Sequence, residues 1–186
     1  MSENKASESG EQANLESVIN RFMGGVRHAH VLGIELLAAD KNGVRLLMPY
    51  QDKIVGNPVT GVIHGGALTT LMDQALGTSI ICAIFPEFDI TPTIDLRMDH
   101  MKPATPGKDI RCYASAYRVT SNVVFTRGFA YHDDENDPLC HCVGTFMRMG
   151  FSRTKDGWSI NAPVPDGSES AAGTSLSDKD SSQKEG

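Results

Sequence analysis

The feature that most constrains the fold is a long apolar stretch at residues 65–85, GGALTTLMDQALGTSIICAIF. Its apolar residues would lie on all sides of a helix of about five turns, so we expect a helix that is buried on most of its surface. The stretch is long enough to cross a membrane. However, Asp73 and Gln74 lie near its centre, where a charged side chain is costly in lipid, and no Lys/Arg cluster flanks it. We therefore expect the core helix of a soluble domain and no membrane span.

The sequence changes to a period of two after this helix, which is typical of strands. Ile94, Leu96 and Met98 alternate with charged residues. Further strands are predicted at 109–119, 122–132 and 139–149 between turn-forming segments, and earlier ones at 33–39 and 44–49 around an Asn-Gly turn. A helix is predicted over 14–30. One antiparallel sheet wrapped around the long helix would bury both, so the predicted class is α+β.

Composition places the chain among ordinary soluble globular proteins, with one domain over residues 14–158. Residues 1–13 and an acidic tail at 159–186 have few apolar residues, and we expect both to be disordered. The net charge of -6 argues against a nucleic-acid partner. The polar N-terminus resembles no signal peptide and the four cysteines form no disulfide framework, which together predict a cytoplasmic protein.

The segment that points to chemistry is GNPVTGVIHGG, residues 56–66, which runs directly into the long helix. Glycines at a helix start leave backbone N–H groups open to a ligand, and the helix dipole adds partial positive charge there. This combination can hold a carbonyl oxygen as it gains negative charge. The same glycines could instead serve only close helix packing, and the motif alone does not decide between the two.

Asp73 favours the chemical interpretation. It is the one acidic or basic residue between His64 and Glu87. Burying a carboxylate is costly unless it has a partner, so its place on a core helix suggests a role as base or nucleophile. A structural carboxylate that caps nearby backbone is the alternative.

The spacing of Gly65 and Asp73 implies an oligomer. Eight residues of helix put them ~12 Å apart, too far for one small reacting group to touch both. If two copies of the helix lie antiparallel across a two-fold axis, Asp73 of one copy can approach Gly65 of the other. We therefore expect a site at a subunit interface.

The run GNPVTGVIHGGALTTLMDQALG resembles the central signature of the PaaI-like hotdog acyl-CoA thioesterases. The later Thr93-x-Asp95-Leu96, Lys102-Pro103-Ala104 and Cys142-Val143-Gly144-Thr145-Phe146 segments are similar to that family's following strands, so the resemblance covers about residues 30–150. It implies a hotdog fold, a homodimer or homotetramer, and hydrolysis of acyl-CoA thioesters without a cofactor or metal.

The resemblance also implies roles for individual residues. Asp73 would activate water or attack the thioester, Gly65 would supply the oxyanion N–H, Asn57 would place the carbonyl or the water, and His64 would support the loop. Substrate-binding roles follow for Gly66, which would let the ligand approach closely, and for Lys102. Arg97 is a further candidate contact for the phosphates of CoA, although a solvated surface role is the favoured interpretation of any single cation of this kind.

Other candidate sites are weaker. Asp99 and His100 are adjacent on a strand and face opposite sides, so a surface or partly packed histidine is the favoured interpretation of His100. In Cys140-His141-Cys142 the cysteines share one face, and no second ligand pair accompanies them, which argues against zinc.

The predicted function is therefore acyl-CoA hydrolysis. Two alternatives stay open: a hotdog hydratase or dehydratase acting on acyl thioesters, and a non-catalytic acyl-CoA-binding protein in which Asp73 is structural.

Overall fold

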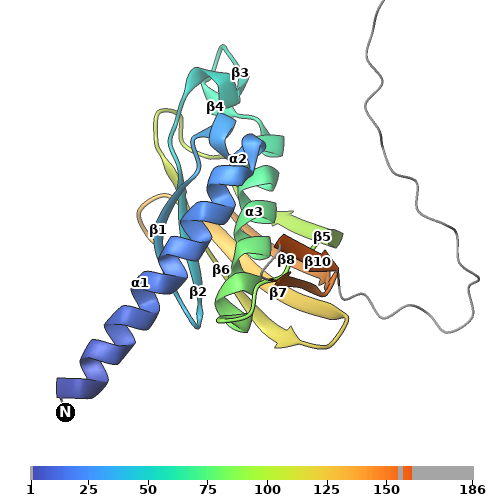
Figure 1. Ribbon diagram of the computed structural model, residues 1–186. Coiled ribbons are helices and arrows are strands. Elements are labelled where there is room, and N and C mark those ends of the chain that lie inside the picture. Colours follow the sequence, from blue (N-terminus) through green and yellow to red (C-terminus); the bar gives the residue numbers. More distant parts are fainter. Residues whose placement is uncertain (1, 155–156, 161–186) are drawn as a thin grey trace, which may run out of the picture.

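The computed structural model describes residues 2–154 and 157–160 (Figure 1). The helices are α1 (Ser2–Gly25), α2 (Arg27–Leu32), the 3-10 turn η1 (Asp52–Ile54) and α3 (Gly65–Ile84). The strands are β1 (Glu35–Asp40), β2 (Gly43–Met48), β3 (Val55–Asn57), β4 (Val62–Ile63), β5 (Thr93–His100), β6 (Ile110–Val119), β7 (Val123–Tyr131), β8 (Cys140–Met147), β9 (Phe151–Thr154) and β10 (Gly157–Ile160).

Six strands form the main sheet, in the order β1-β2-β6-β7-β8-β5, and every neighbouring pair is antiparallel. These are the strands expected from the period-two pattern, displaced by no more than two residues at the ends. β5 therefore lies at one edge of the sheet, next to β8. Two short ribbons, β3–β4 and β9–β10, stand apart from this sheet and were not predicted.

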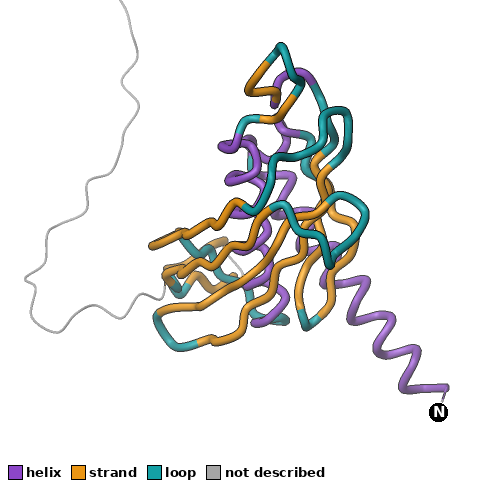
Figure 2. The backbone as a smooth tube through the Cα atoms, turned by 180° about the vertical axis from the view of Figure 1, so that it is seen from behind, coloured by secondary structure: helices purple, strands orange, loops and turns teal. Residues whose placement is uncertain are grey.

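Helix α3 is the core helix. It packs across β2, β6 and β7, and the sheet curves around it (Figures 1 and 2). Leu71, Met72, Leu76 and Ile80 on α3 are fully buried. α3 is the one helix in the described ranges that is long and apolar enough to cross a membrane, but here it is enclosed within the fold. The predicted α+β arrangement of one long helix and one antiparallel sheet is confirmed.

The sheet has an inner face packed on α3 and an outer face directed away from it. Along β8, Cys140, Cys142 and Phe146 are buried, whereas Val143 and Met147 are exposed. Along β5, Leu96 and Met98 pack against the core. Because strand side chains alternate, Arg97 and Asp99 project from the outer face.

The N-terminal region differs from the prediction. Helix α1 begins at Ser2, so residues 2–13, which we expected to be disordered, are helical. The segment is free of proline and rich in Ala, Glu, Lys and Gln, which are good helix formers. Leu15, Ile19 and Met23 anchor its second half in the core at helical spacing.

The helix predicted over 14–30 is also two helices. Gly24 and Gly25 have low helix propensity, and Val26 leaves the helical region with φ -89° and ψ 94°.

Strand β10 ends at Ile160, and residues 161–186, most of the predicted tail, lie outside the described residues.

Candidate active site

The N-terminus of α3 is capped by His64. Its backbone is extended, and Nδ1 of its ring accepts a hydrogen bond from the N–H of Gly66 at 2.9 Å. Its carbonyl accepts the N–H of Ala67 at 3.0 Å, and its own N–H donates to the carbonyl of Ile54 at 2.8 Å. His64 thus fixes the first turn of α3 against the segment before β3.

The cap leaves the N–H of Gly65 available. The first N–H groups of a helix have no partner within the helix. His64 satisfies the next two, those of Gly66 and Ala67, but no hydrogen-bond acceptor in the described chain pairs with the N–H of Gly65. Gly65 therefore presents a donor at the positive end of the helix dipole, where a developing negative charge is stabilised.

Two other glycines of the motif make room for His64. A Cβ at position 66 would lie 2.8 Å from Nδ1 of His64, and a Cβ at position 56 would lie 2.8 Å from its Cα. We expected Gly66 to lack a side chain so that the ligand can approach closely. The hydrogen bond between His64 and the N–H of Gly66 already requires a glycine at this position. Gly56 lets the β3–β4 ribbon pass directly against the helix start.

Asn57 is the last residue of β3, directly before the turn that leads to β4. Its Oδ1 accepts hydrogen bonds from the N–H groups of Val59 at 3.0 Å and Thr60 at 3.4 Å. In the described part of the chain this side chain orders the turn and makes no hydrogen bond with Gly65 or Asp73.

Asp73 lies on the side of α3 that faces the start of β5. It is half-buried in the single chain, and its Oδ1 accepts a hydrogen bond from the hydroxyl of Thr93 at 2.8 Å. Thr93 was not predicted as a site residue, because nothing in the spacing of residues 73 and 93 indicates that they meet. The hydrogen bond holds one carboxylate oxygen and leaves the other available.

Cys142 lies close to this carboxylate on the inner face of β8. Burial raises the pKa of its thiol to about 12, and the negative charges of Cys140 and Asp73 act in the same direction. A neutral buried thiol is a poor nucleophile, so Asp73 stays the candidate reactive group at this position.

A pocket of about 300 Å³ opens beside Gly65. Its lining is mainly apolar, with His100 and Lys102 as its ionisable members; it consists of Val62, Ile63, Gly65, Leu68, His100, Met101, Lys102, Pro103 and Ala104. A Cβ at Gly65 would lie 3.7 Å from Cε1 of His100. His100 is exposed, as expected of a surface histidine, and its ring also lies next to the predicted oxyanion donor.

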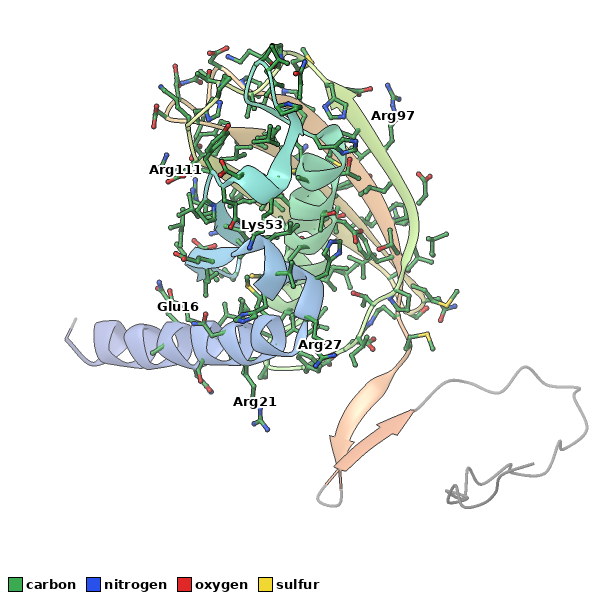
Figure 3. All side chains as sticks on the ribbon, turned by 90° about the horizontal axis from the view of Figure 1, so that it is seen from above. Glu16, Arg21, Arg27, Lys53, Arg97 and Arg111 are labelled. Carbon is green, nitrogen blue, oxygen red and sulfur yellow. The ribbon has the colours of Figure 1, made fainter. Side chains whose placement is uncertain are left out.

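The two candidate CoA contacts differ in position. Lys102 lines the pocket and forms an ion pair with Asp137. Arg97 is 71% exposed, pairs with Asp99 at 3.0 Å and projects from the outer face of β5 (Figure 3). The single chain therefore does not bring Arg97 together with Gly65 and Asp73.

Gly65 and Asp73 lie beside opposite ends of β5, since Gly65 is near His100 and Asp73 bonds Thr93. α3 and β5 therefore run antiparallel, and the predicted oxyanion donor and the carboxylate lie apart along both elements.

In the described residues no group of three or more His, Cys, Asp or Glu side chains is arranged to hold a metal ion. Cys140 and Cys142 are buried, whereas His141 is exposed on the other face.

Comparison with known proteins identifies the family of this segment and its fold. The family model described as Thioesterase superfamily matches residues 60–139, from the turn before α3 to the start of β8. Residues 60–139 belong to the thioesterase superfamily. The matched range contains Gly65, Asp73, Thr93 and His100, so every group that we place at the candidate site, apart from Asn57, lies within the family's own segment.

Two relatives of this superfamily member are similar in sequence. The medium/long-chain acyl-CoA thioesterase YigI of Escherichia coli is 26% identical over 149 residues, which cover 74% of this chain and 94% of YigI. A protein of Halobacterium salinarum is 35% identical over 94 residues, but the match spans only 50% of this chain and 61% of that protein.

Solved structures share the fold. A crystal structure of a Pseudomonas aeruginosa protein has 53% identity and a TM-score of 0.67, covering 73% of this chain and 99% of the other. The E. coli PaaI protein from the phenylacetic acid degradation operon has a TM-score of 0.67 at 15% identity, covering 76% and 98%. The predicted hotdog fold and the resemblance to PaaI in fold are confirmed.

Proposed function

We propose that this thioesterase-superfamily protein hydrolyses acyl-CoA thioesters as a homodimer. The observation that carries the proposal is the pair of groups on α3: an unpaired N–H at Gly65 and a carboxylate at Asp73, both toward β5. An amide donor that stabilises an oxyanion and a carboxylate that activates water are the two elements that acyl hydrolysis requires. The acyl-CoA thioesterase YigI, similar over most of its length, supports the same chemistry.

The site is completed by a second copy of the chain. β5 is an edge strand, and Ile94 near its start and Met101 directly after its end are 53% and 62% exposed. Antiparallel pairing of β5 with the same strand of a partner would cover this edge, as isologous two-fold contacts do. Because Asp73 lies near Thr93 and Gly65 near His100, such pairing places Asp73 of one protomer beside Gly65 of its partner.

The reaction follows from these positions. Thr93 holds one oxygen of Asp73, and the other accepts a proton from a water molecule that attacks the thioester carbonyl carbon. The carbonyl oxygen becomes negative next to the N–H of Gly65 of the opposite protomer. As the tetrahedral species collapses, the C–S bond breaks and CoA leaves as a thiolate. The proton that Asp73 accepted passes to the thiolate, which restores the carboxylate. Because a thiolate leaves readily, a carboxylate base and an oxyanion donor are sufficient.

The substrate that we propose is an aliphatic acyl-CoA of medium to long chain. The pocket beside Gly65 is lined mainly by apolar side chains, and YigI is named for medium and long acyl chains. Lys102 at the pocket rim is the cation that we assign to a CoA phosphate. It would exchange its ion pair with Asp137 for the ligand as a point charge.

The test is thiol release from acyl-CoAs of two to eighteen carbons by the wild-type protein and by Asp73→Asn. We expect turnover by the wild type and a fall in kcat of about 10²–10⁴-fold in the variant, the usual contribution of a general base. Asp95→Asn is the matched control, because Asp95 is an exposed carboxylate of β5. Full activity of Asp73→Asn would remove Asp73 from the mechanism.

The other functions compatible with the sequence have different outcomes. Hydration of an enoyl-CoA without thiol release would show a hydratase. Tight binding of acyl-CoA without any turnover would show a binding protein with a structural Asp73.

A further inference from the structure

His100 is the least committed histidine near the candidate site. In the described residues neither of its ring nitrogens has a hydrogen-bond partner. His132 is different: its Nε2 accepts the N–H of Thr105 at 2.9 Å and its Nδ1 lies 2.7 Å from the carbonyl oxygen of Asp109. His64 uses Nδ1 to cap α3. The fold therefore occupies His64 and His132 and leaves His100 available to a ligand.

The imidazole of His100 is directed at Gly65. Its Cε1 and Nε2 atoms would lie 3.7 and 3.9 Å from a Cβ at that position. His100 has the same parity in β5 as Leu96 and Met98, which pack on the core, so the alternation of the strand turns it toward α3, and it is exposed at the end of the strand. Gly65 and this ring edge line the same pocket.

We propose that His100 supplies a second hydrogen bond to the oxyanion, from its Nε2–H, beside the N–H of Gly65. This inference rests on the proposed thioesterase function. It gives the developing charge two donors, where the helix terminus offers only one that is unpaired. The proposal also gives a reason for glycine at position 65. Without a side chain there, the ring of His100 and the N–H of Gly65 can both face the ligand.

The proposal divides the site between the protomers. His100 and Gly65 belong to one protomer, whereas Asp73 and its Thr93 partner come from the other. One protomer therefore provides the groups that hold the oxyanion, and its partner provides the group that activates water.

The test compares His100→Phe, which keeps a ring but has no donor, with His100→Gln, which keeps an N–H at similar reach. For His100→Phe we expect kcat to fall by about 10²–10³-fold, as for loss of one oxyanion donor. KM should change little, because the charge develops only in the transition state. His100→Gln should recover part of the rate. His141→Phe is the matched control, since His141 is an exposed histidine on the outer face of β8.

A binding measurement separates a contact with the oxyanion from one with the rest of the substrate. An alkyl-CoA thioether has the sulfur and the chain but no carbonyl, so its Kd should be the same for the wild type and His100→Phe. An unchanged kcat in His100→Phe would overturn the proposal. So would a raised KM and thioether Kd at constant kcat, which would make His100 a binding residue only.

Two further outcomes are distinguishable. A wild-type protein without hydrolytic activity would contradict the proposed function itself. If His100→Phe does not assemble like the wild type by size-exclusion chromatography, His100→Leu replaces it as the variant without a donor and the same criteria apply.

Discussion

Gly65→Pro is a substitution that removes the proposed oxyanion donor and little else. Proline has no N–H, and it is well accommodated at the first position of a helix, where Gly65 lies. The preceding residue, His64, has φ -70° and ψ 133°, which is the extended conformation that a following proline requires. Since no acceptor in the described chain pairs with the Gly65 N–H, no internal hydrogen bond is lost.

The expected result has two opposite parts. Loss of one oxyanion-hole donor typically lowers kcat by about 10²–10³-fold, equivalent to ~2.7–4 kcal/mol of transition-state stabilisation. A proline that fits the native backbone reduces the entropy of the unfolded chain and stabilises the fold by ~0.4–1 kcal/mol. Gly65→Pro should therefore be a slower enzyme that is slightly more stable.

The assay is thiol release at saturating acyl-CoA together with chemical denaturation of the same preparations. Gly65→Ala is the matched control, because it adds a Cβ at an ordinary contact distance, 3.7 Å from His100, and keeps the N–H. If Gly65→Pro turns over as fast as Gly65→Ala, the amide is not the oxyanion donor. A loss of several kcal/mol of stability in Gly65→Pro would show that the N–H has a structural partner.

Three further predictions follow from single contacts. Thr93→Val removes the hydrogen bond to Asp73. Because hydrogen bonds to charged groups contribute ~1.5–3 kcal/mol, steady-state kinetics should show a kcat about 10–100-fold lower at constant KM. An unchanged kcat would exclude a role of Thr93 in holding the catalytic carboxylate. Gly77→Ala, whose Cβ would lie at an ordinary 3.5 Å from the core, should raise Tm by about 2–4 °C through helix propensity; a lower Tm would indicate overpacking. Burial raises the pKa of the Cys112 thiol to about 12, so this thiol should react with thiol reagents at pH 8 only after unfolding. Its contribution to stability is complete below the unfolded pKa and should decline between pH 9 and 12 in denaturation series, and fast labelling of the folded protein would contradict its burial.

Most of the fold could be predicted from the sequence, because burial leaves a periodic pattern. The apolar residues around Leu71 and Leu76 predicted α3, and the alternation at Leu96 and Met98 predicted β5. The β3–β4 ribbon left no such pattern, since its strands are only three and two residues long. The extension of α1 to Ser2 was missed because polar composition alone was taken to indicate disorder.

The candidate site was predicted less completely. The HGG motif and Asp73 could be found because glycines at a helix start and a lone acid in an apolar helix are unusual in any sequence. Thr93 and His100 were missed because their partners are 20 and 35 positions away in the chain, at distances that the fold alone determines. One signal was present for His100: it shares the parity of Leu96 and Met98, which pack on the core.

Asp73 was expected to be deeply buried and is half-buried in the single chain. The reason lies in its position, since it faces the start of the edge strand β5 rather than the centre of the sheet. Pairing of β5 with a second protomer would cover this side of α3. Full burial of the carboxylate is therefore expected only in the dimer.

Mixing inactive variants tests the shared site most directly. Asp73→Asn and Gly65→Pro chains, each inactive alone, would be unfolded together, refolded and assayed for thiol release. If the site combines Asp73 of one protomer with Gly65 of its partner, each mixed dimer has one intact site, and random pairing should restore about a quarter of the wild-type activity. Asp73→Asn mixed with Thr93→Val is the control, because those two residues meet within one chain and no mixed site is intact. No recovery in the first mixture, despite proven mixed dimers, would contradict the account.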